Sequence, residues 1–214
     1  YSIFFFARKI GAALLYEDIE ASFQLQYAWR NGGRYFQGQY LELPKDKFIE
    51  RDVLKDRLQA EFHQFITHEK KKLTILYDHS EQFYKRVHQL VTSLKKTAQS
   101  DDEFLFNLGK ELTDCSFRIY MCDEDGIQLT KNVFKHDGAW IFQPEYIGKN
   151  WSWRPYFLEN IMRMRTMRKG FFSDLYSDIE TGEMIRTFSY PMDEELYLFI
   201  DLSYSYLYEQ DGLI

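Results

Sequence analysis

The sequence predicts an α+β fold in three consecutive segments. Residues 1–43 carry a strand–helix–strand pattern, residues 44–99 carry a long helical pattern, and residues 100–214 carry alternating apolar strands interrupted by helices. Strands joined through a helix pair in parallel, whereas short strands joined by tight turns form antiparallel sheets. We therefore expect a small βαβ piece, a helical connector and a C-terminal antiparallel sheet with helices packed on it.

Composition excludes several functional classes. Hydrophobic residues make up 45% and charged residues 28% of the 214 residues, which is typical of a globular protein. Lys and Arg number 27 against 33 Asp and Glu, so the net charge of −6 gives no electrostatic reason to expect a nucleic-acid partner. No apolar run approaches the ~20 residues needed to cross a bilayer, so we expect no membrane span.

The termini and the cysteines bear on where the protein works. The chain opens on Tyr1 and turns apolar at once, without the basic stretch of a signal peptide, so we expect it to begin inside a longer polypeptide. Cys115 and Cys122 are spaced neither as a redox pair nor as half of a zinc site. A reduced, cytoplasmic protein is the expectation.

The first segment contains two strands around a helix. Residues 11–16 form a continuous apolar run, which is typical of a strand buried on both faces, and residues 34–37 form the second strand. Between them, residues 22–31 are helical, and one helix face carries Phe23, Tyr27 and Ala28.

The second segment carries a coiled-coil-type seam. Its apolar positions follow a 3-4 spacing with one polar interruption, at Leu73, Leu76, Ser80, Phe83, Val87, Leu90 and Leu94. Two interpretations stay open. The helix lies on its own domain, or it is a connector that pairs two subunits.

The third segment alternates helices with strands. Ser100 and the acidic residues after it predict a helix start. A further helix is predicted over residues 157–168, with one apolar face formed by Phe157, Ile161 and Met164. Strands are predicted at residues 117–122, 171–176, 184–190 and 196–202.

Two polar residues end the strands of the first segment. Glu17 directly follows the first strand and Gln37 ends the second. Active-site side chains project from the carboxyl ends of strands in parallel barrels, and a carboxylate with an amide suits a hard divalent cation. Acidic residues after a strand are also common in ordinary loops, so the spacing alone leaves both interpretations open.

Residues 14–20 (LLYEDIE) and 33–38 (GRYFQG) together resemble the closing part of EAL domains. That family hydrolyses cyclic di-GMP on a (β/α)8 barrel. The resemblance implies that Glu17 is a catalytic and metal-binding residue, that Glu20 is the second glutamate of the motif, and that Gln37 is an active-site residue. It also implies Mg or Mn as the cofactor of the complete parent and cyclic di-GMP as its ligand.

The resemblance to EAL barrels covers only residues 1–43, and Asp18 stands where the family usually has Gly. The signature motifs of the remaining barrel strands are absent from the sequence. We therefore expect the chain alone to be inactive and to need no cofactor, and it stays open whether the parent hydrolyses or only binds cyclic di-GMP.

Residues 61–72, 151–157 and 170–176 resemble the C-terminal region of YkuI-like EAL proteins. In that family the barrel is followed by a helical connector and a PAS-like, or Cache-like, domain. The resemblance implies a cytoplasmic homodimer that works in cyclic di-GMP signalling, and a C-terminal domain that senses an unknown small ligand.

Residues 154–157 (RPYF) resemble a motif of Cache sensor domains, in which Arg and Tyr bind a ligand carboxylate and Asp binds the ligand amine. Arg offers a two-pronged donor to a carboxylate. We therefore expect Arg154, Tyr156, Asp174 and Tyr176 to bind the ligand. Alternatively, the aromatic residues form a core in which Arg154 pairs with a structural carboxylate.

These observations predict the regulatory and dimerising C-terminal part of an EAL signalling protein. Two alternatives stay open, a freestanding module that binds a small ligand and a purely structural dimerisation element.

Overall fold

The computed structural model describes residues 2–154 and 156–210, in two compact units, Tyr1–Lys71 and Lys72–Ile214. The elements of the first unit are α1 (Ser2–Lys9), β1 (Leu14–Tyr16), α2 (Ser22–Arg30), β2 (Gly33–Phe36) and the beginning of α3 (Lys55–Leu94). The predicted division at residues 43 and 99 stays a prediction.

The first unit is the expected βαβ piece. Strands β1 and β2 pair in parallel, with α2 as the crossover between them. A small core gathers Ile19, Leu25, Ala28 and Leu41, and Leu54, Leu58 and Phe62 pack against it.

Two expectations for the first unit were wrong. Strand β1 is not buried on both faces, because Leu15 is 51% exposed. Within the described residues β1 belongs to a two-stranded sheet, so only one neighbour covers it. Helix α2 buries Leu25 and Ala28, whereas Phe23 and Tyr27 are exposed. Leu25 and Ala28 share one helix face, and Phe23 and Tyr27 share another, so the spacing alone fits either pair. Packing against the strands decides which pair is buried.

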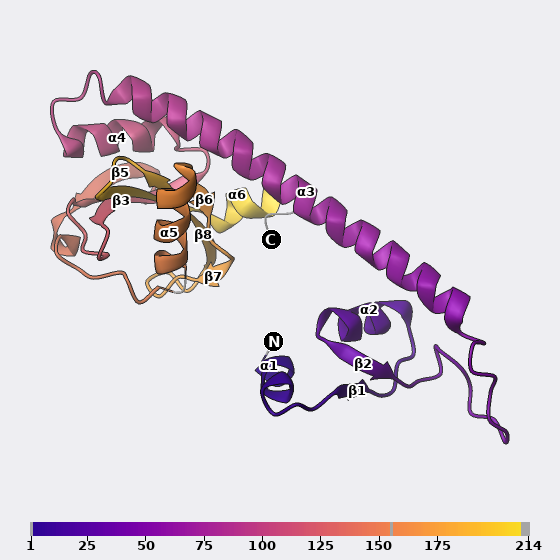
Figure 1. Cartoon of the computed structure of the whole chain (residues 1–214). Coiled ribbons are helices and arrows are strands. Elements are labelled where there is room, and N and C mark those ends of the chain that lie inside the picture. Colours follow the sequence, from indigo (N-terminus) through magenta and orange to yellow (C-terminus); the bar gives the residue numbers. More distant parts are fainter. Residues whose placement is uncertain (1, 155, 211–214) are drawn as a thin grey trace. The chain divides into compact units, whose positions relative to one another are not determined.

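The second unit is built around a seven-stranded sheet (Figure 1). Its strands are β3 (Ser116–Asp123), β4 (Asn132–His136), β5 (Ala139–Gln143), β6 (Phe171–Phe172), β7 (Tyr176–Ser177), β8 (Met184–Pro191) and β9 (Leu196–Leu202). The order is β5-β4-β3-β9-β8-β6, β7 pairs with β8, and the pairings are antiparallel. The predicted α+β class with an antiparallel sheet is confirmed.

Helices cover both faces of this sheet. On one face, α4 (Asp101–Glu111), α6 (Tyr204–Glu209) and the C-terminal half of α3 pack on alternate residues of β3, β8 and β9. On the other face, α5 (Phe157–Met167) packs on Tyr120, Cys122, Tyr197 and Phe199. Figure 1 shows α4 and α5 on opposite sides of the sheet. Successive side chains along β3 and β9 point to opposite faces of the sheet, so each of these strands contributes residues to both cores.

Helix α3 begins at Lys55, directly after the turn at residues 51–54, rather than at the start of the predicted connector. From Leu76 onward its seam packs into its own domain, where Phe83 and Val87 are 5% and 0% exposed. Pairing of two subunits through Val87 is therefore excluded, since α4 and the sheet already cover it. Leu73 stays 50% exposed. No described helix is both long and apolar enough to cross a membrane.

The predicted strand at residues 171–176 is broken into β6 and β7. Ser173 leaves the regular ladder because its hydroxyl accepts the N–H of Thr187 at 2.9 Å, while its own N–H donates to Thr187 O at 2.8 Å. Arg186 Nη1 also donates to Ser173 O at 2.7 Å. These bonds turn the chain between the two short strands. The sequence did not predict the β4–β5 hairpin or α6.

Candidate functional site

The two strand ends of the first unit lie side by side. The N–H of Gln37 donates to Tyr16 O at 2.9 Å, and the N–H of Ile19 donates to Gln37 O at 3.0 Å. These bonds hold Gln37 against the loop that carries Glu17, and both residues are exposed. Asp18 adopts a left-handed conformation with φ of 57°, which explains why a glycine is suited to this position.

Gly38 makes this arrangement possible. A Cβ at Gly38 would overlap the backbone N and O of Ile19, so only glycine permits the close approach of the two loops. The N–H of Tyr40 then donates to Ile19 O at 2.9 Å. The glycine that follows Gln37 is thus required by packing between the two strand ends.

Glu17 alone does not make a metal centre in this chain. Across residues 2–154 and 156–210, no group of three or more His, Cys, Asp or Glu side chains is placed to hold a metal ion. Glu20 is exposed, as Glu17 is. A surface hollow of about 310 Å³ beside Glu17 is lined by the aromatic residues Tyr16, Phe23 and Tyr27 and by Asp18, Ile19 and Gln24. The residues present do not hold Mg²⁺ or Mn²⁺ by themselves.

A row of polar side chains crosses the sheet of the second unit. Arg118 on β3 is paired in register with Asp201 on β9, which is paired with Thr187 on β8. Arg118 Nε donates to Asp201 Oδ2 at 2.6 Å, and Thr187 Oγ1 donates to Asp201 Oδ1 at 2.5 Å. Asp201 is fully buried, so both of its oxygens need these partners.

The turn between β7 and β8 is tied to this row by two carboxylates. Arg118 Nη2 donates to Asp178 Oδ1 at 2.6 Å, and Arg118 Nη1 donates to Glu180 Oε2 at 2.7 Å. The N–H and the hydroxyl of Thr181 both donate to Asp178 Oδ2 at 3.1 Å. Arg118 therefore binds carboxylates from β9 and from the turn at once.

Arg154 is buried next to these groups, with 5% of its surface exposed. Its Nη1 donates to the hydroxyls of Tyr120, Tyr156 and Tyr176 at 3.0, 3.1 and 3.3 Å. Its Nη2 lies 3.8 Å from Asp178 Oδ1. The protein's own side chains thus occupy the guanidinium that the sequence assigned to a ligand carboxylate.

Protonation within this cluster follows from burial and charge. Burial raises the pKa of Asp178, but the hydrogen bond and the charge of Arg118 outweigh burial and hold that pKa below its ordinary value. Burial raises the pKa of Tyr120 and Tyr176 well above the ordinary value. The two phenols are therefore neutral acceptors for Arg154, and Asp178 is its anionic neighbour.

A cavity of about 220 Å³ adjoins these tyrosines. It lies between α5 and the β6–β7 segment, and it is lined by Tyr156, Glu159, Asn160, Arg163, Phe172, Ser173, Asp174, Leu175 and Tyr176. Three of the four predicted ligand-binding residues line it. The fourth, Arg154, contacts Tyr156 and Tyr176 from within the cluster, and Pro155 lies outside the described residues.

Sequence reasoning missed Arg118, Asp178, Thr187 and Asp201. A signal was present, because Arg118 and Asp201 each interrupt an apolar strand, at FRIYMC and FIDL. A charged residue inside such a strand needs a buried partner. Which partner it meets depends on the pairing of β3 with β9, and the two residues are far apart in sequence.

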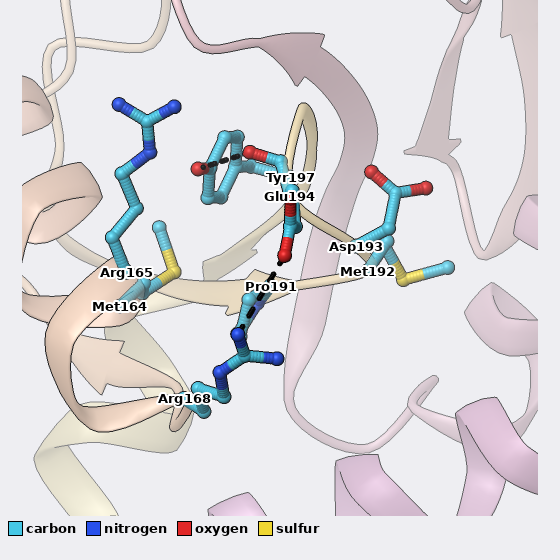
Figure 2. Close-up of a pocket in the computed structure, with 8 residues that line it drawn as sticks. All are labelled: Met164, Arg165, Arg168, Pro191, Met192, Asp193, Glu194 and Tyr197. Atoms are coloured by element: carbon cyan, nitrogen blue, oxygen red, sulfur yellow. Dashed lines mark hydrogen bonds and ion pairs between the residues drawn. The ribbon is translucent and has the colours of Figure 1, made fainter.

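A second hollow, of about 470 Å³, lies between the end of α5 and the β8–β9 turn (Figure 2). Met164 and Met192 line it, and Arg168 Nη2 lies 3.6 Å from Glu194 Oε1 at its rim. Figure 2 shows this ion pair and the bond from the Tyr197 hydroxyl to Glu194 O. None of the predicted site residues contributes to this hollow.

Comparisons with known proteins bear on the whole chain. It is 79% identical over 215 residues to the EAL-domain containing protein YkuI of Bacillus subtilis (strain 168), covering 100% of this chain and 53% of YkuI. The crystal structure of that protein, with an EAL domain, in complex with substrate c-di-GMP and calcium, matches with a TM-score of 0.96 over 100% of this chain and 54% of that one. The chain thus spans about half the length of its curated relative.

A chemoreceptor domain also matches most of the chain, at low identity. The ligand-binding domain of Campylobacter jejuni Tlp3, in complex with L-valine, matches 78% of this chain and 68% of that chain with 12% identity and a TM-score of 0.49. The family model for an EAL-domain associated signalling protein domain matches residues 48–214. With most of its length matched by that model, the chain belongs to the family of EAL-domain associated signalling protein domains.

Proposed function

We propose that the chain is the regulatory and dimerising C-terminal part of a cyclic di-GMP phosphodiesterase-family protein, and that its last domain, residues 100–214, senses a small ligand. The family, and the adjacent strand ends that carry Glu17 and Gln37, support the link to an EAL barrel. The observation that carries the sensor role is the cavity lined by Tyr156, Asp174 and Tyr176. Pockets that combine aromatic walls with a few polar groups are typical ligand sites.

In the complete parent, Glu17 binds Mg²⁺ or Mn²⁺ and Gln37 belongs to the same site. YkuI, the relative, has been crystallised with c-di-GMP and calcium, which supports cyclic di-GMP as the ligand of the parent barrel. The chain by itself brings two strands of that barrel. A (β/α)8 active site draws residues from several strand ends, so the chain alone is expected to lack turnover.

Two experiments test the two halves of the proposal. The 214-residue chain is screened for small molecules that raise its melting temperature, and a hit supports the sensor role. The longer parent is then assayed with cyclic di-GMP and Mg²⁺ or Mn²⁺, with and without that hit. Hydrolysis that changes with the hit supports regulation, whereas hydrolysis by the 214-residue chain alone contradicts the assignment of the barrel.

One observation favours a second candidate, a structural element with no ligand. The Arg154 guanidinium is already bound by three tyrosine hydroxyls and lies near Asp178. A domain whose arginine is satisfied internally does not need a ligand for stability. Under this candidate, the screen yields no compound that raises the melting temperature, while the chain is still a homodimer.

A further inference from the structure

The first turns of α3 contact both strand-end loops of the first unit, which are residues 17–21 after β1 and residues 37–41 after β2. Glu61 lies on α3, and its Oε2 accepts the hydroxyl of Ser22 at 2.7 Å. Its Oε1 accepts the hydroxyl of Tyr40. Ser22 begins α2 directly after the first loop, and Tyr40 lies in the second. One carboxylate on a third element therefore joins the end of the first loop to the second loop.

The surroundings of Glu61 favour its charged form, which is the stronger acceptor. The hydroxyls of Tyr40 and Ser22, together with the charge of Arg57, outweigh burial and hold the pKa of Glu61 below its ordinary value. Arg57 lies one turn earlier on α3, with its guanidinium 4.4 Å from the centre of the Tyr40 ring. Its Nη1 also donates to Leu41 O at 3.3 Å. Hydrogen bonds to a charged acceptor are about twice as strong as neutral ones.

The loops that Glu61 joins are the ones that carry Glu17 and Gln37. The N–H of Ile19 donates to Gln37 O at 3.0 Å, and the N–H of Tyr40 donates to Ile19 O at 2.9 Å. Both bonds that hold the second loop against the first thus involve Ile19, and one of them comes from Tyr40. The position of the Tyr40 side chain therefore bears directly on how Glu17 and Gln37 lie relative to each other.

A second carboxylate of α3 contacts α2 at its other end. Glu69 forms a two-pronged ion pair with Arg30, with both N–O distances at 2.5 Å. The Ser22–Glu61 and Arg30–Glu69 pairs are both 39 residues apart, so α3 runs alongside α2 in the same direction. Arg30 ends α2, whereas Ser22 begins it beside the strand-end loops. Both carboxylates dock α3 on α2, but they do so at opposite ends.

We infer that Glu61 is a positioning residue for the strand ends that carry Glu17 and Gln37. It acts by holding two hydroxyl groups, one at each loop, at a fixed separation. The inference rests on the proposed function and deepens its regulatory part, because α3 also contributes Val87 to the core of the second unit. A change in α3 then reaches the strand ends through the contacts of one carboxylate.

Hydrogen exchange on the 214-residue chain tests the inference without any ligand. In Glu61→Ala, peptides covering residues 17–22 and 37–42 are expected to exchange at least about tenfold faster, because both loops lose a charged acceptor. Peptides from β3 and β9 should keep their protection. The matched control is Glu69→Ala, which removes the other carboxylate that docks α3 on α2. It is expected to leave the exchange of both loop peptides unchanged.

A double-mutant cycle separates positioning from a general loosening of the unit. Ser22→Ala removes the hydroxyl at the first loop, and it is expected to speed exchange of residues 37–42 about threefold or more. In the Glu61→Ala background the same change should have no further effect. Glu61→Gln keeps an oxygen that accepts one hydroxyl, so its exchange should lie between those of the wild type and Glu61→Ala. Independent effects of Ser22→Ala and Glu61→Ala, or an equal rise in Glu69→Ala, would overturn the inference.

The longer parent distinguishes this inference from the proposed function. There, Glu61→Ala is expected to weaken binding of cyclic di-GMP at least about tenfold in calorimetry, and Glu69→Ala to leave it unchanged. A wild-type parent that does not bind cyclic di-GMP would contradict the proposed function, while exchange on the shorter chain still decides whether Glu61 joins the loops. Equal binding by the wild type and Glu61→Ala would overturn the positioning role and leave the proposed function standing.

Discussion

At the scale of single residues, Gly38 determines how the two strand ends of the first unit meet. We expect Gly38→Ala to destabilise this unit, because the added Cβ would overlap the backbone of Ile19. Overpacking of this kind costs about 1–3 kcal/mol. Hydrogen exchange of peptides covering residues 12–43 should become faster, while peptides from the sheet of the second unit keep their protection. The control Gly138→Ala meets open space, and its φ of 80° makes it a test of strain without overlap.

Asp178 is the second residue at which the structure predicts the effect of a substitution on stability. Its side chain is 1% exposed and pairs with Arg118. We expect Asp178→Asn to lower the free energy of unfolding by about 3–5 kcal/mol near neutral pH, because Arg118 then loses a buried anion. The control Asp137→Asn should change it by less than about 0.5 kcal/mol.

The same pair predicts a pH dependence. Arg118 holds the folded-state pKa of Asp178 below its ordinary value of 3.8, after burial has partly opposed it. A carboxyl group with a lowered folded pKa stabilises the fold above its unfolded pKa, and this stabilisation is lost as pH falls through the folded pKa. In urea unfolding, the free energy of unfolding of the wild type should therefore exceed that of Asp178→Asn by a constant gap from pH 7 to pH 5. This gap should narrow below about pH 3.8. A gap that is unchanged at pH 2.5 would contradict the ion pair.

At the scale of elements, the apolar seam of α3 packs into the core of its own domain. Val87 is fully buried against α4 and the sheet. We expect Val87→Glu to destabilise the second unit by at least about 3 kcal/mol, because it buries a carboxyl group without a partner. Gln89→Glu, on the exposed side of the same helix, should leave the melting temperature nearly unchanged. A stable Val87→Glu variant would mean that α3 does not pack as described.

The elements also show which parts of the fold are predictable from the sequence. Helix α4 was predicted from its start, where the Ser100 hydroxyl accepts the N–H of Glu103 at 3.2 Å, and α5 was predicted from its periodic apolar face. Helix α2 was also predicted, but its buried face is formed by Leu25 and Ala28 rather than by Phe23 and Tyr27. Strands β3, β8 and β9 were predicted from their length and alternation. The break between β6 and β7 was not, because it depends on bonds between Ser173 and Thr187 across the sheet.

The candidate site was likewise predictable only in part. Local motifs were sufficient to single out Arg154, Tyr156 and Tyr176, which the structure brings together. Asp174 lines the neighbouring cavity with both tyrosines. The sequence left open that Arg154 pairs with a structural carboxylate, but it could not identify Asp178, which reaches Arg154 only when the β7–β8 turn is tied to Arg118. Register between distant strands, rather than any local pattern, creates that cluster.

At the scale of the whole molecule, the exposed beginning of the α3 seam is where pairing of subunits is still possible. Leu73 is 50% exposed although it continues the apolar spacing of the buried seam. We expect light scattering of the chain to give about twice its mass of 25.9 kDa. Leu73→Glu should reduce this to the mass of a monomer, because it places like charges opposite each other in a symmetric pair.

Leu73→Glu separates pairing from folding. The residue lies outside the core of the second unit, so the melting temperature extrapolated to low protein concentration should match that of the wild type. Gln89→Glu serves as the control for added charge and should stay dimeric. A Leu73→Glu chain that is still dimeric would move the interface away from this part of α3, whereas a wild-type chain that is monomeric at every concentration would remove dimerisation from the proposed function.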